Sequence, residues 1–164
     1  MNIYNFTDAV NRDIIVQDKN NPPSSKNEII NKAIKKTLDN LQIEDLLKQY
    51  RKKHDEEDCN PLTGHCFVAT EVLWELLKEK NINEYLPNYI YHENCGHWFL
   101  KHKISGDIID ITAGQFKTSV SYHRKGRRSS MMRLPDVPTK RTIAVLDRIK
   151  KMNQQLNLQK IDTR

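Results

Sequence analysis

The fold depends most on residues 64 to 80, which read GHCFVATEVLWELLKEK. From Cys66 onward, apolar side chains cover more than half of the circumference of a helix, as expected of a helix buried inside a domain. The preceding residues, Cys59 to Gly64, are rich in turn formers and predict a loop. The sequence therefore predicts a central helix with Cys66 at its N-terminus.

Two further helices are predicted on the N-terminal side of this segment. Ser25 and Glu28 have capping-box spacing, and apolar residues recur at helical intervals as far as Leu41. A shorter helix is predicted over residues 43 to 53. The residues of its apolar face are Ile43, Leu46, Leu47 and Tyr50. Residues 1 to 23 end in Asn-Asn-Pro-Pro and are predicted to form a peripheral arm.

The C-terminal side predicts an antiparallel sheet followed by a helix. Alternating and aromatic residues favour strands at 89–92, 97–103 and 107–112, with Ser105-Gly106 as the turn of a hairpin. Pro138, as a first-turn residue, is predicted to open a last helix that runs through Met152. Residues 24 to 154 are thus expected to form one α+β domain, with a frayed tail at 155–164.

Length and composition agree with a single domain. The chain has 164 residues and 37% hydrophobic residues, enough for one core but too few for two comfortable domains. No apolar run approaches the roughly 20 residues of a membrane span, and no secretory signal is evident. Three cysteines in a chain of this size favour free thiols over a disulfide framework. We therefore expect a cytoplasmic protein without a membrane partner.

Cys66 is the candidate nucleophile. A thiolate forms most easily where a helix N-terminus and an imidazole stabilise it, and His97 at the start of a strand packed on the central helix can supply the imidazole. A carboxylate on the adjacent strand can orient that ring, and Asp110 is the natural candidate. The order of these three residues predicts a cysteine, histidine and carboxylate site.

The simplest hairpin does not place Asp110 opposite His97. A two-residue turn at Ser105-Gly106 would pair Lys101 with Asp110, whereas a residue near 114 would face His97. A longer turn or a bulge would close part of this gap. Asp107 lies nearer the turn and is worse placed.

Several motifs resemble those of the YunG family, a set of small bacterial and phage proteins. Gly64-His65-Cys66 stands at a helix start, His97-Trp98-Phe99-Leu100 follows, and then Asp110-Ile111-Thr112 with Gln115-Phe116. The order of Cys, His and Asp-x-Thr is also similar, more loosely, to transglutaminase-like enzymes. The resemblance covers residues 60 to 150 and implies a papain-like or transglutaminase-like core with Cys66, His97 and Asp110 as a triad.

These features predict a cysteine-dependent acyl-transfer enzyme that acts on a protein or small molecule and needs no cofactor. The amides at the start of the Cys66 helix would help to stabilise an oxyanion. The further candidates for binding substrate or stabilising an oxyanion are Asn60, His65, Trp98 and Gln115. Gln115 matches a family position, whereas His65 stands where relatives often carry Gln.

A second function class remains open, because the basic charge is concentrated at one end. Residues 117 to 164 carry 13 basic and 3 acidic side chains, whereas residues 1 to 116 carry 14 basic and 18 acidic ones. A loop after Tyr122, which is available to stack, could bind a phosphate, a nucleic acid or an acidic protein. Its anion-binding candidates are Arg124, Lys125, Arg127 and Arg128. The chain could therefore be a binding protein without catalysis.

The same residues also allow purely structural roles or a zinc site. Cys66 could be an ordinary buried residue, and Asp110 could cap a turn at Thr112 to Gly114. The soft or borderline ligands that could bind zinc are Cys59, His65, Cys66, Cys95 and His97. Their spacing does not reproduce zinc knuckles, so no metal is predicted.

Overall fold

The computed structural model describes residues 25–56, 58–122 and 137–162. The predicted arm at residues 1–23 and the four basic candidates Arg124, Lys125, Arg127 and Arg128 lie outside these ranges. The described part is an α+β fold, as predicted, with four α-helices and one three-stranded antiparallel sheet in the order β1-β2-β3. None of the described helices is long and apolar enough to cross a membrane.

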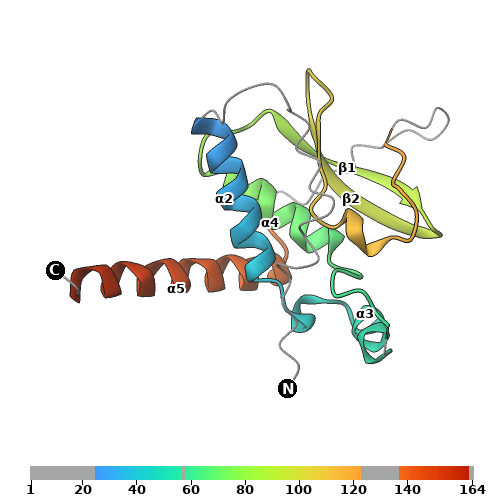
Figure 1. Cartoon of the computed structure of the whole chain (residues 1–164), viewed down its shortest axis with the longest axis horizontal. Coiled ribbons are helices and arrows are strands. Elements are labelled where there is room, and N and C mark those ends of the chain that lie inside the picture. The colour runs from blue at the N-terminus through green and yellow to red at the C-terminus, as the bar shows by residue number, and fades with distance from the viewer. Residues whose placement is uncertain (1–24, 57, 123–136, 163–164) are drawn as a thin grey trace.

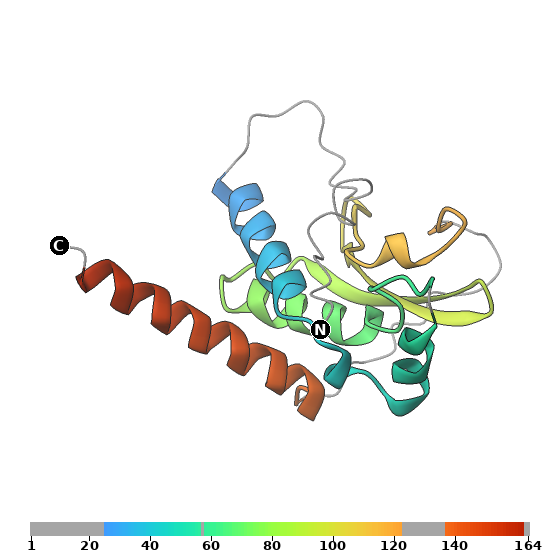
Figure 2. The same ribbon diagram turned by 60° about the horizontal axis from the view of Figure 1, so that its bottom comes forward.

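Helix α4 (Cys66–Lys78) is the centre of the fold and confirms the predicted central helix. It contacts α2 (Ser25–Asp39), α5 (Lys140–Asp162), β1 (Tyr85–His92) and β2 (Cys95–His102). Figures 1 and 2 show α4 between the helices α2 and α5 and the sheet. Val68, Val72 and Leu77 of α4 have no exposed surface. The hydrophobic core therefore forms on both sides of this helix.

The predicted helix over residues 43 to 53 is confirmed only at residues 48–51. The chain instead forms a 3₁₀ turn, η1 (Ile43–Asp45), then α3 (Lys48–Arg51) and a second 3₁₀ turn, η2 (Lys52–Asp55). Leu46 and Leu47 are extended, with ψ of 153° and 148°, and interrupt the helix. The Asp45 carboxylate accepts a hydrogen bond from Gln42 N at 2.8 Å, which holds the chain in the tight turn before this break. Leu47 is consequently 46% exposed instead of buried.

The sheet differs from the prediction in length and register. β1 begins at Tyr85, four residues before the predicted strand, and pairs with β2 through a tight turn at Glu93-Asn94, whose φ angles are 44° and 60°. β3 (Ile108–Ile109) is only two residues long. Lys101 faces Ile108, not Asp110, and His102 N donates to Asp107 O at 2.8 Å. The turn between β2 and β3 therefore contains the four residues 103–106.

Helix α5 begins later and ends later than predicted. Thr139, not Pro138, immediately precedes the helix, and Thr142 N donates to its Oγ1 at 3.4 Å. The helix continues to Asp162 through the predicted tail. Its C-terminal half extends away from the rest of the domain (Figures 1 and 2).

Candidate active site

Cys66 is the first residue of α4, and the loop before it determines where the helix begins. Gly64 has φ of 81°, a left-handed conformation that suits glycine, and it packs against the Tyr50 ring. Only 8% of Cys66 is exposed. Its thiol approaches Gly96 O on β2 at 3.8 Å. The candidate nucleophile therefore lies at the junction of the central helix and the sheet.

His97 is placed by the alternation of β2. His97 and Phe99 point to one face of the strand, whereas Leu100 points to the other and joins the core around α4. The His97 ring is completely buried, packs edge-on against Phe116 with the ring centroids 4.7 Å apart, and stacks on Phe99. A ring enclosed in this way has a single orientation.

Asp110 and His97 are direct partners. His97 Nε2 lies 2.5 Å from Asp110 Oδ2, and both side chains are buried. The four-residue turn makes this possible, because it shifts β3 by two residues relative to the simple hairpin and brings Asp110 diagonally next to His97. Asp110 Oδ1 also accepts from Thr112 N at 3.1 Å, so the predicted turn-capping role exists alongside the histidine contact.

The surroundings of His97 favour its protonated form. Burial lowers the pKa of His97, but the Asp110 hydrogen bond, the polar contact of Cys66 and the charges of both residues outweigh burial and raise the pKa to about 9. With Nε2 bound to Asp110, Nδ1 is the remaining ring nitrogen, and it has no hydrogen bond of good geometry to any described residue. Cys66 and Asp110 thus act on His97 together.

Asn60 and Gln115 join the loop before α4 to the turn η3 (Ala113–Gln115). Asn60 Nδ2 donates to Gly114 O at 2.6 Å, and Gln115 Oε1 accepts from Gly64 N at 3.2 Å. The Gln115 amide also donates to Thr112 O at 3.0 Å. These two predicted site residues therefore hold the segment after Asp110 against the segment before Cys66.

His65 and Trp98 are both buried beside Cys66. Burial first, and then the charges of His54 and Arg141, lower the pKa of His65 to about 4, so this ring is neutral at physiological pH. Trp98 forms a small cluster with Cys66 and packs edge-on against Phe67 and Tyr89, each at 5.3 Å between ring centroids. Trp98 thus supplies an aromatic wall next to the thiol.

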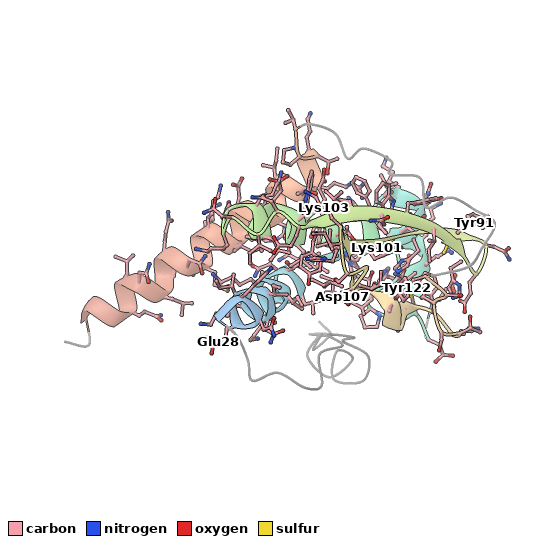
Figure 3. All side chains as sticks on the ribbon, turned by 90° about the horizontal axis from the view of Figure 1, so that it is seen from above. Glu28, Tyr91, Lys101, Lys103, Asp107 and Tyr122 are labelled. Carbon is pink, nitrogen blue, oxygen red and sulfur yellow. The ribbon has the colours of Figure 1, made fainter. Side chains whose placement is uncertain are left out.

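Tyr122 belongs to the site, although the sequence indicated only that it could stack. Its hydroxyl donates to Asp110 Oδ2 at 2.7 Å, and its ring packs against Phe99. Figure 3 shows the side chain on the side of the sheet that carries the 113–115 turn. No periodicity relates residue 122 to residue 110, so local sequence patterns contain no signal for this contact.

The other two cysteines do not join Cys66 in a metal site. All three cysteines are free, and no group of three or more His, Cys, Asp and Glu among the described residues could hold a metal ion. The Cys95 thiol donates to His92 O at 3.3 Å, and burial raises the pKa of this thiol. As whole residues, Cys59 and Cys95 are partly exposed, whereas Cys66 is buried.

No protein-family model, no curated protein and no solved structure matches the chain.

Proposed function

We propose that the chain is a cysteine-dependent acyl-transfer enzyme with Cys66 as the nucleophile, His97 as its acid-base partner and Asp110 as the residue that orients His97. The main support is the buried His97 ring, which is bound by Asp110 through Nε2 and has its pKa raised by Asp110 and Cys66. At neutral pH such a ring is protonated and can stabilise a Cys66 thiolate. That pair is the reactive form of a cysteine nucleophile.

The reaction would begin when Cys66 Sγ attacks the carbonyl carbon of an amide or ester. The carbonyl oxygen then takes the negative charge. The backbone N–H groups at the start of α4 are available to stabilise it, because the first α-helical bond is that of Ala69 N to His65 O. His97 gives its proton to the leaving amine or alcohol, and a thioester remains on Cys66.

The second half restores the enzyme. His97 removes a proton from a water molecule or an acceptor amine, which attacks the thioester and releases the acyl group from Cys66. Throughout both steps Asp110 holds the ring in one orientation. Hydrolysis, deamidation and acyl transfer differ only in the leaving group and the acceptor.

The order of the three residues supports the proposed relation to papain-like and transglutaminase-like enzymes. Cys66 is on a central helix, His97 is on an antiparallel strand and Asp110 follows the next strand. We propose that the three-stranded sheet and α4 are a reduced core of this type. The alternative of a protein that uses its basic C-terminal third to bind nucleic acid or a partner protein stays a prediction, and its candidates at 124–128 lie outside the described ranges.

Alkylation of the three cysteines within one molecule tests the proposal. Folded protein is treated with iodoacetamide at pH 6, and labelling of Cys59, Cys66 and Cys95 is followed by peptide mass spectrometry. Cys66 should react at least about tenfold faster than the other two because of its paired imidazole. Exposure alone predicts the reverse order, since Cys66 is the most buried of the three.

Two variants and a matched control complete the test. His97→Gln should reduce Cys66 labelling to the rate of the other cysteines, and Asp110→Asn should slow it less. His92→Gln is the control, because its ring also packs edge-on with Phe116, whereas its Nε2 lies 3.2 Å from Thr118 O and bonds to neither Asp110 nor Cys66 in the described structure. If Cys66 in the native protein reacts no faster than in denatured protein, the proposal is wrong.

A further inference from the structure

The Asp110 carboxylate has more donors than a histidine-orienting residue requires. Oδ1 accepts from Thr112 N at 3.1 Å and from Thr112 Oγ1 at 3.4 Å. Oδ2 accepts from His97 Nε2 at 2.5 Å and from Tyr122 Oη at 2.7 Å. The Tyr122 bond is the one that shares an oxygen with His97. It is therefore the bond best placed to modify the histidine contact.

The position of Tyr122 is determined by packing as well as by this bond. The ring lies 4.9 Å from Phe99, centroid to centroid, and Phe99 stands on the same face of β2 as His97. Removal of the hydroxyl alone would leave the ring contact in place. The ring of Tyr122 packs against Phe99 and its hydroxyl binds Asp110, so the two contributions can be tested separately.

We infer that Tyr122 is a positioning residue of the proposed site, which donates to Asp110 Oδ2 and so limits how strongly this carboxylate holds the His97 ring. The inference rests on the proposed function. A hydrogen bond donated to a carboxylate spreads its negative charge and weakens its attraction for a second cation. His97 must both accept and release a proton, so an unmoderated contact with Asp110 would hold the proton too tightly.

A titratable group other than Tyr122 that faced His97 could also change the pKa of this ring. Among the described residues, the titratable groups that act on His97 are Cys66 from α4, Asp110 after β3 and, through Asp110, Tyr122. Cys95 and His92 lie two residues away along β2 and β1 on the same face of the sheet. On β1, Ile90 is the register partner of His97, and it is uncharged. Phe116, the residue that follows η3, packs against the His97 ring and is uncharged. A change confined to the Tyr122 oxygen therefore reaches His97 through Asp110.

The test is an NMR titration of the His97 ring in protein labelled with ¹³C-histidine, with the signal assigned through His97→Gln. In Tyr122→Phe the His97 midpoint should rise by about half to one pH unit, because Asp110 then presents more charge to the ring. The pH above which His97 no longer accelerates Cys66 alkylation should also rise in Tyr122→Phe. Because burial lowers the pKa of His97, exposure of the ring through lost packing would also raise the midpoint, so the contact of residue 122 with Phe99 is checked in the same protein by NMR.

Matched substitutions keep the test decisive. Tyr91→Phe removes a hydroxyl that donates to Asn94 O at the tip of the β1–β2 hairpin (Figure 3), and it should leave the midpoint unchanged. Should Tyr122→Phe not fold, 3-fluorotyrosine at position 122 keeps the shape but donates more strongly, and it should lower the midpoint.

An unchanged or lower midpoint in Tyr122→Phe, or an unchanged or higher one with 3-fluorotyrosine, would overturn the inference. In that case rapid wild-type labelling of Cys66 would still support the proposed function. Slow wild-type labelling of Cys66 would instead show that the proposed function itself is wrong.

Discussion

At the scale of single residues, the site depends on groups that serve backbone geometry as well as chemistry. Gly64 lies two residues before Cys66 and donates its N–H to Gln115. A Cβ at this position would lie 2.7 Å from Tyr50 Cγ, closer than real contacts allow. The loop can therefore approach both Tyr50 and η3 only with glycine at this position.

Gly64→Ala is predicted to reduce the free energy of unfolding by about 2 to 4 kcal/mol, because positive-φ strain and overlap with Tyr50 add together. Urea unfolding measures the change, and Cys66 labelling should slow as the loop shifts. Gly106→Ala is the matched control. It has a similar φ of 78°, but its Cβ would meet only Lys101 Cε at 3.7 Å, so it should cost about 1 kcal/mol. Equal losses in the two variants would contradict the overlap argument.

At the scale of elements, a buried carboxylate joins two helices. Glu71 of α4 is 1% exposed and accepts from Thr139 Oγ1 at 2.8 Å and from Thr142 Oγ1. Both threonines lie at the N-terminus of α5, where the helix dipole favours a negative charge. This interaction places the start of α5 against the middle of α4.

Glu71→Ala should destabilise the protein by about 2 to 4 kcal/mol, because it leaves a cavity and removes this acceptor from the buried Thr142 hydroxyl and the partly buried Thr139 hydroxyl. Hydrogen exchange should accelerate first at the start of α5. Glu75→Ala, one turn later on α4, removes a partly exposed ion pair with Lys78 and should cost less than about 1 kcal/mol. Similar exchange rates in the two variants would show that Glu71 does not anchor α5.

At the scale of the whole molecule, two buried histidines in different parts of the fold make the free energy of unfolding depend on pH in opposite directions. The pKa of His65 is lowered to about 4, and that of His97 is raised to about 9, from 6.5. Between pH 4 and 6.5 the unfolded chain binds a proton at residue 65 that the folded chain does not, so stability rises with pH. Between pH 6.5 and 9 the folded chain retains a proton on His97, so stability falls as pH rises.

These two histidines predict a stability maximum near pH 6.5, with each contributing on the order of 3 kcal/mol across its window. Urea unfolding at pH 5, 6.5 and 8.5 measures the profile. His65→Gln should flatten the acidic side and His97→Gln the alkaline side, while His92→Gln should change neither. A maximum that stays equally sharp in His97→Gln would contradict the assignment of the alkaline limb.

The sequence alone determined the helices at 25–39 and 66–78 and the position of Cys66, because apolar periodicity and turn-forming residues are local signals. It also predicted His97 on a strand. The contact of His97 with Asp110 was decided by the tertiary structure, since a four-residue turn in place of a two-residue turn changes the strand register. The Tyr122 bond to Asp110 was likewise decided by a contact between distant segments, which no local pattern records. The break at Leu46-Leu47 instead follows a local turn that Gln42 and Asp45 close, a polar contact that apolar periodicity does not record.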